Sequence, residues 1–208
     1  MNILWKGKNC FRVESGGSTL LVDPFEGEKG TRAVRWDGGD VVALSRPAAV
    51  PERKGSSRSD ASLPPRANTA FVIAGPGEYD FKNFFVQSWL GPAQDLIYLI
   101  ETEGVKLCHW PSALDKELNE DQLARVGEVD VLMVAVGDDA DANEAAAKLV
   151  NQIEPRLVVP MGFDPAKKPA TFLKEMGASG VEPQNKLSLK KKDLPLEEIE
   201  VVLLGNSK

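Results

Sequence analysis

The chain has 208 residues, 42% of them hydrophobic, which is enough for one substantial core, and we expect a single domain over residues 1–208. Its formal net charge of −6 repels phosphate backbones and argues against a nucleic-acid partner. No apolar stretch approaches the roughly 20 residues that span a bilayer, and residues 1–13 alternate in a way unlike a signal peptide. We therefore expect a cytoplasmic protein that does not associate with membranes.

Short strands are predicted along the first 110 residues, where brief apolar runs are bounded by Gly, Asn and Asp. The expected strands are residues 2–5, 10–14, 18–22, 41–44, 69–73, 84–88, 96–101 and 105–109. Their close succession suggests antiparallel pairing, with a hairpin turn at Glu103 and Gly104. Between the two groups, the segment Glu52–Arg66 is rich in Ser, Pro, Arg and Gly and is predicted to be a long exposed loop. The Pro-Gly pair within residues 75–79 favours a turn over an anion-binding backbone cradle.

Helices and strands alternate after residue 109. Helices are expected at residues 119–126, 141–153 and 169–176, and strands at 131–135, 157–160 and 199–204. Asp141 and Glu144 have N-cap and N3 spacing at the start of the second helix. This capping explains Asp141 without a cation bound to the nearby Asp138 and Asp139. Patterning alone thus predicts a mixed α/β or α+β domain and names no reaction.

Six segments, in order along nearly the whole chain, resemble the ascorbate-phosphate-lactonase-like branch of the metallo-β-lactamase superfamily. They are ILWKGKNCFRV (residues 3–13), LLVDPF (20–25), DVVALS (40–45), GPGEYDF (75–81), LIYLIETEGVKLCHW (96–110) and VNQIEPRLVVPMGF (150–163). The resemblance implies a four-layer αββα sandwich of two mixed sheets. It also implies zinc or manganese at the rim, held by imidazole and carboxylate groups that activate a water for hydrolysis.

The residues that hold the metal in this family are replaced here. The motif Ser-His-x-His-x-Asp-His is expected after Leu44, where the chain reads Ser-Arg-Pro-Ala-Ala-Val-Pro and places Arg46 at the first histidine. Ser112 replaces the metal-bridging aspartate, Gly162 replaces the histidine of a Pro-Met-His segment, and Lys8 stands where a histidine commonly follows the first glycine. A further histidine is missing from a loop shortened to residues 89–92. Because losing even one outer partner of a ligand typically weakens a metal site roughly 10- to 100-fold, we predict that the metal site is lost.

The single histidine of the chain, His109, is a non-ligand position by this resemblance and is expected to be a hydrogen-bonded structural residue. Cys108 should point to the opposite face of the same strand and be part of the core. Cys10 and Cys108 are expected to be buried free thiols, although a disulfide between them stays open. No GxSxG motif surrounds Ser112, which argues against serine catalysis. The lysines at 190–192 are expected to form a solvated turn.

We therefore predict a non-catalytic pseudo-hydrolase that needs no cofactor. Its vestigial cleft, lined by Arg46, Lys8, Ser112, His109 and Gly162, would bind a small anionic ligand, or its surface a protein partner or a second copy of the chain. The alternative is a hydrolase that holds zinc or manganese through unfamiliar residues. In that case His109 would act together with Asp23, Asp138 or Asp164.

Overall fold

The computed structural model describes residues 1–24, 39–46, 70–112, 117–137, 140–164 and 167–205. Its strands are β1 (Asn2–Gly7), β2 (Cys10–Ser15), β3 (Ser18–Val22), β4 (Val41–Ala43), β5 (Phe71–Ile73), β6 (Gly77–Phe81), β7 (Phe84–Leu90), β8 (Leu96–Thr102), β9 (Val105–Trp110), β10 (Val131–Ala135), β11 (Leu157–Met161), β12 (Leu187–Ser188) and β13 (Glu200–Val201). The helices are α1 (Glu120–Val126), α2 (Ala140–Ile153) and α3 (Ala170–Glu175), with a 3₁₀ turn at Lys191–Asp193. The predicted loop Glu52–Arg66 lies outside the described residues.

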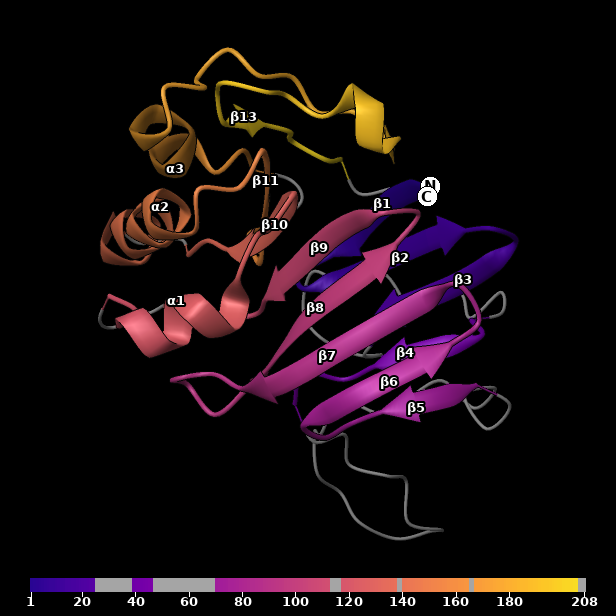
Figure 1. Ribbon diagram of the computed structural model, residues 1–208. Coiled ribbons are helices and arrows are strands. Elements are labelled where there is room, and N and C mark those ends of the chain that lie inside the picture. The colour runs from indigo at the N-terminus through magenta and orange to yellow at the C-terminus, as the bar shows by residue number, and fades with distance from the viewer. Residues whose placement is uncertain (25–38, 47–69, 113–116, 138–139, 165–166, 206–208) are drawn as a thin grey trace, which may run out of the picture.

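Two mixed sheets pack against each other, which confirms the predicted fold class. One has the order β12-β1-β2-β3-β4-β5, and the other has the order β13-β11-β10-β9-β8-β7-β6. Figure 1 shows α1, α2 and α3 beside the second sheet, on the side of β10 and β11. None of the helices in these described ranges is long and apolar enough to cross a membrane.

The first sheet is less antiparallel than its short strands suggested. Strands β1, β2 and β3 form an antiparallel meander, but β4 runs parallel to β3 and β5 runs parallel to β4. A parallel neighbour requires a long crossover, and the connections from β3 to β4 and from β4 to β5 are long enough for one. The strand spacing alone did not reveal this.

The hairpins of the second sheet confirm one predicted turn and correct another. Glu103 and Gly104 have φ values of 50° and 72° and join β8 to β9 by a two-residue turn. The predicted turn at residues 75–79 is confined to its first two residues, because β6 begins at Gly77 and pairs with β7. β7 also extends through Trp89 and Leu90, which we had placed in a loop.

The helices form where their patterns predict. Asn119 caps α1 through a reciprocal capping box with Gln122. α2 begins at Ala140, so Asp141 lies in its first turn and is not the N-cap residue. The predicted strand at 199–204 is shorter than expected, since only Glu200 and Val201 pair with β11.

The C-terminal segment spans both sheets, because β12 pairs with β1 and β13 pairs with β11. The lysine run 190–192 is not simply solvated. Lys191 donates to both carboxylate oxygens of Asp130, at 2.7 and 2.9 Å, and the Asp130 side chain is only 7% exposed. The backbone N–H of Lys106 donates to the same carboxylate at 2.9 Å. This contact fastens the segment to the N-terminal ends of β9 and β10.

Candidate functional site: a cavity at the strand ends

A cavity of about 350 Å³ opens where the two sheets present one set of strand ends. Lys8 reaches it from the turn between β1 and β2, and Arg46 from the segment after β4. Ser112, Gly137 and Gly162 reach it from the ends of β9, β10 and β11. Residues distant in the sequence converge here because strands of both sheets end at this rim.

Four of the five predicted cleft residues therefore line one cavity: Lys8, Arg46, Ser112 and Gly162. The fifth, His109, does not line it. Its side chain is completely buried between the sheets, beneath the turn that carries Lys8. The convergence is a geometrical fact, whereas ligand binding by these residues stays a prediction.

The turn at Lys8 is firmly attached to the rim. Lys8 has a left-handed backbone with φ of 48°, and its carbonyl accepts bonds from the Trp5 indole at 2.7 Å and the Gly162 N–H at 3.0 Å. The ammonium of Lys8 donates to the Gly162 carbonyl at 3.4 Å. An ammonium has three donors, so Lys8 is held at the rim with capacity for further acceptors.

Gly162 occupies a position that disfavours a side chain. Its φ is 86°, and a Cβ added there would lie 3.3 Å from the Val136 carbonyl oxygen and 3.4 Å from Asn9 Oδ1. Both the backbone conformation and the close neighbours disfavour any other residue. The histidine that the family resemblance implies at this position would not fit without movement of the rim.

Arg46 is placed by the buried residue before it. Ser45 donates to both carboxylate oxygens of Asp23, through its N–H at 2.7 Å and its hydroxyl at 2.5 Å, while its own carbonyl accepts from the Leu96 N–H at 2.7 Å. These bonds tie the end of β4 to both sheets and leave the Arg46 side chain exposed at the cavity. Burial raises the pKa of Asp23, against the opposing effects of His109, Ser45 and Arg46.

Burial favours the neutral form of His109. Burial lowers its pKa, although Asp23, the Asn9 carbonyl and Asp95 act in the opposite direction. Its Nε2 lies 3.0 Å from the Asn9 carbonyl oxygen, which can only accept, so Nε2 carries the proton. Nδ1 is buried and has no hydrogen-bond partner among the described residues. The predicted structural hydrogen bond is therefore present.

Asp95 is a cavity residue that the sequence did not single out. It ends a tight turn in which the Gly91 N–H donates to the Asp95 carbonyl at 2.8 Å, and Gln94 has φ of 64°. Its side chain is half-buried and accepts a hydrogen bond from the Ser112 hydroxyl. Among the described residues that line the cavity, Asp95 is the one carboxylate, opposed to the two cations Lys8 and Arg46.

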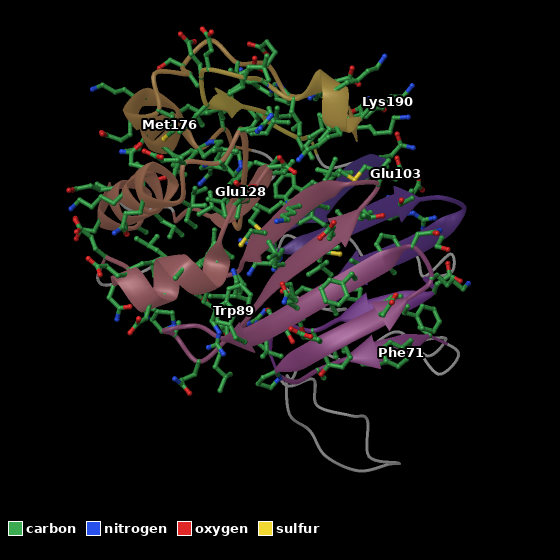
Figure 2. All side chains as sticks on the ribbon, viewed as in Figure 1. Phe71, Trp89, Glu103, Glu128, Met176 and Lys190 are labelled. Carbon is green, nitrogen blue, oxygen red and sulfur yellow. The ribbon has the colours of Figure 1, made fainter. Side chains whose placement is uncertain are left out.

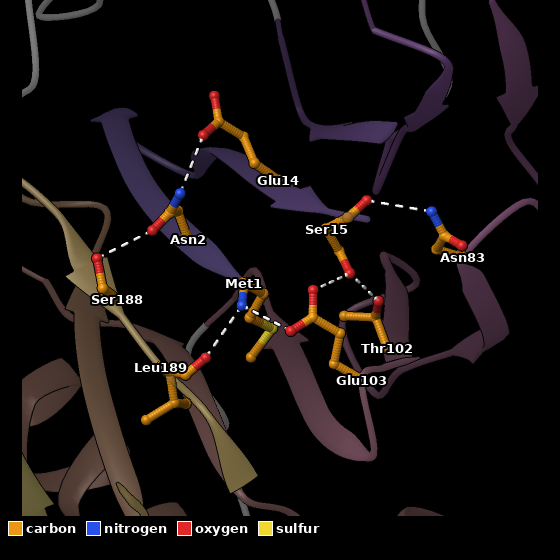
Figure 3. Close-up of polar contacts among 9 residues, drawn as sticks. All are labelled: Met1, Asn2, Glu14, Ser15, Asn83, Thr102, Glu103, Ser188 and Leu189. Atoms are coloured by element: carbon orange, nitrogen blue, oxygen red, sulfur yellow. Dashed lines mark hydrogen bonds and ion pairs between the residues drawn. The ribbon is translucent and has the colours of Figure 1, made fainter. Parts of the chain in front are cut away.

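A larger cavity, of about 580 Å³, lies at the opposite ends of the strands. Figure 3 shows the polar residues around it bonded to one another. Glu103 accepts from the amino group of Met1 at 2.8 Å and from the Ser15 hydroxyl at 2.7 Å, and Thr102 donates to Ser15 at 2.7 Å. Because these groups satisfy each other, they form a structural network and not an obvious ligand site.

Comparisons with known proteins place this fold. A family profile described as a beta-lactamase superfamily domain matches residues 2–162. A candidate Zn-dependent hydrolase of the metallo-beta-lactamase superfamily from Thermotoga maritima is 25% identical, with a TM-score of 0.69 over 98% of this chain and 100% of that one. No curated protein matches the chain.

Two more distant structures share the fold alone. YhfI from Bacillus subtilis, a metallo-beta-lactamase fold protein, has a TM-score of 0.59 at 11% identity, over 100% of this chain and 98% of that one. Igni18 from Ignicoccus hospitalis, a metallo hydrolase, has a TM-score of 0.58 at 13% identity, over 91% of this chain and 99% of that one.

The described residues do not fit the metal that this superfamily implies. Zinc and manganese sites need several imidazole, thiolate or carboxylate ligands, and no group of three such side chains is placed to hold an ion in the part of the chain that the structure describes. Of the alternative ligands, His109 donates through Nε2 and keeps Nδ1 as a possible ligand atom, and Asp23 is bound by Ser45 through both oxygens, but no third such side chain completes a site with them among the described residues. Asp138 lies outside the described residues. Asp164 does not line the cavity.

Proposed function

Because the chain belongs to the metallo-beta-lactamase superfamily but, by its sequence resemblance to that family, carries Lys8 and Arg46 at positions of histidines near the metal, we propose that it is a metal-independent binding protein. Its ligand is a small anion, held in the strand-end cavity. The observation that carries the proposal is the convergence of Lys8 and Arg46 on one cavity whose described lining has a single carboxylate.

The charges of the lining support this choice of ligand. A divalent cation near Lys8 and Arg46 would be repelled by both, whereas an anion gains Coulomb energy from both. The guanidinium of Arg46 presents five N–H donors in a planar fork that matches a carboxylate or phosphate, so it can hold an anion while bonded elsewhere. The volume lies at the small end of the range of roughly 300–1,000 Å³ for ligand pockets. A compact ligand is therefore expected.

The test is a titration of isotopically labelled protein with sodium acetate and, separately, with sodium phosphate, both in the presence of EDTA. The amide chemical shifts are monitored by NMR at each step. Sodium chloride serves as the control for ionic strength. We expect saturable shifts of the Lys8, Gly137 and Gly162 amides, with a dissociation constant on the order of 1–10 mM for such small probes.

A matched pair of double variants assigns the site. Lys8→Gln with Arg46→Gln should remove the saturable shifts, whereas Lys174→Gln with Lys192→Gln, which removes the same charge from exposed positions elsewhere, should retain them. Shifts that scatter over surface lysines, or that survive in the first double variant, would contradict an anion site in the cavity.

A further inference from the structure

The strand-end cavity carries charges of both signs, and this narrows the class of ligand. Lys8 and Arg46 supply the cations, and Asp95 faces the same space. Asp95 is not a mobile surface group, because the turn from Gly91 to Asp95 closes through a backbone hydrogen bond of 2.8 Å and its side chain accepts from Ser112. The ligand therefore meets a fixed carboxylate as well as two cations.

Asp95 retains capacity to accept a hydrogen bond. An ionised carboxylate has about four lone-pair positions, and one of its two oxygens, Oδ2, accepts the Ser112 hydroxyl. An anionic ligand that only accepts hydrogen bonds would be repelled by this carboxylate. It would also remove water from the carboxylate without supplying a hydrogen-bond donor in its place. A ligand that also donates a hydrogen bond would satisfy Asp95.

Building on the proposed function, we propose that the cavity takes a small carboxylic acid with a hydroxyl or ammonium group close to its carboxylate. The carboxylate is held by Lys8 and Arg46, and the hydroxyl or ammonium group donates to Asp95. Simple fatty acids bind less tightly because they lack a donor for Asp95. Inorganic phosphate binds less tightly because it carries more negative charge.

A series with one carbon skeleton tests this inference. Propionate has no donor, lactate adds a hydroxyl, and alanine adds an ammonium group at the same carbon. Titrated at pH 7 in EDTA and followed by the same amide shifts, lactate or alanine should bind at least about tenfold more tightly than propionate, as expected for a hydrogen bond to a charged group. Preference for lactate identifies a hydroxyl donor, and preference for alanine identifies an ammonium donor.

Two variants separate this inference from the function on which it rests. Asp95→Asn removes the negative charge and should reduce the preference over propionate to less than about threefold, while Asp80→Asn, which removes the same charge from an exposed position in β6 away from the cavity, should keep it. Equal binding of all three acids, still abolished by Lys8→Gln with Arg46→Gln, would overturn the ligand class and leave the anion site intact. Binding of none of them would overturn both.

Discussion

The two ends of the β-sandwich use polar residues differently. At one end, Glu103, Ser15 and the Met1 amine bond to one another around the larger cavity, and the Asp130 carboxylate is bound by Lys191 nearby. At the other end, two cations and Asp95 face a smaller cavity. Figure 2 shows Glu103 and Lys190 at the first end and Trp89 toward the second.

The difference teaches that cavity size alone does not indicate function. The larger cavity is surrounded by groups whose hydrogen bonds are made within the protein, which stabilises the fold. Among the described residues that line the smaller one, two cations face one carboxylate, and the proposed ligand would neutralise the difference. Substitution of these mutually bonded polar groups should therefore lower stability at the first end, whereas substitution of the charged groups should change binding at the second.

The largest effect on stability is expected at Asp130. Asp130→Ala removes a buried carboxylate that accepts from Lys191 and from the Lys106 backbone N–H, and it should lower the free energy of unfolding by about 3 kcal/mol. Lys191→Gln should cost only about 1 kcal/mol, because Lys191 is half-exposed and Arg156 remains 3.6 Å from the same carboxylate. Urea denaturation measures both. Equal losses for the two variants would contradict this account of the C-terminal attachment.

A smaller effect distinguishes two glycines at opposite ends. Gly162→Ala combines positive φ with close neighbours, whereas Gly17 has a similar φ of 79° but nothing within 4 Å of an added Cβ. We expect Gly17→Ala to lower the free energy of unfolding by about 1 kcal/mol and Gly162→Ala by about 2 kcal/mol. The same denaturation experiment compares them. If Gly17→Ala proved the more harmful, the rim at Gly162 would be less tightly packed than described.

The network in Figure 3 predicts a contrast between two serines. Ser15 is buried and bonded to Glu103 and Thr102, so Ser15→Ala should cost about 1–2 kcal/mol of unfolding free energy. Ser188 is exposed and donates only to Asn2 among the described residues, so Ser188→Ala should change stability by less than about 0.5 kcal/mol. Thermal unfolding of both variants tests the contrast, which a loss at Ser188 as large as that at Ser15 would refute.

The two ends should also differ in pH dependence. Burial lowers the pKa of His109 below its ordinary value of 6.5. Below pH 6.5 the unfolded chain therefore binds more protons than the folded protein does. The stability that neutral His109 contributes above pH 6.5 is lost as the pH falls. The raised pKa of Asp23 acts in the opposite direction above pH 3.8, and comparison with His109→Gln removes the part of that effect that does not depend on His109. The advantage of the unmodified protein over this variant should shrink from pH 7.5 to 5. A constant difference would mean that His109 is not buried in its neutral form.

At the other end, the Met1 amine and Ser15 lower the pKa of Glu103 below 4.5. Its contribution is present above pH 4.5 and is lost only as the pH falls below that value. The difference in stability between the protein and Glu103→Gln should therefore stay constant from pH 7.5 to 5. A difference that shrinks across this range would contradict the assignment.

Local patterning predicted most of the strands and all three α-helices, because alternation and capping act over a few residues. It failed where a contact joins distant parts of the chain. The parallel course of β4, the pairing of β12 with β1, and the ion pair between Lys191 and Asp130 have no local signal.

The candidate site shows the same contrast between features that have a local signal in the sequence and features that depend on distant parts of the chain. The convergence of Lys8, Arg46, Ser112 and Gly162 was expected only through the family resemblance, which relates positions that spacing cannot connect. Asp95 was missed because an aspartate in a tight turn is common and nothing nearby indicates a cavity. Its position at the cavity becomes evident only when Ser112 and Arg46 are placed in space.

The most direct test of the central claim is the metal content of untagged protein, purified without chelator and measured by elemental mass spectrometry before and after incubation with zinc and manganese. A metal-independent site predicts less than about a tenth of an equivalent and no thermal stabilisation by either ion. One equivalent or more, with a rise in melting temperature on adding the metal, would contradict the account and point to a metal-dependent hydrolase instead.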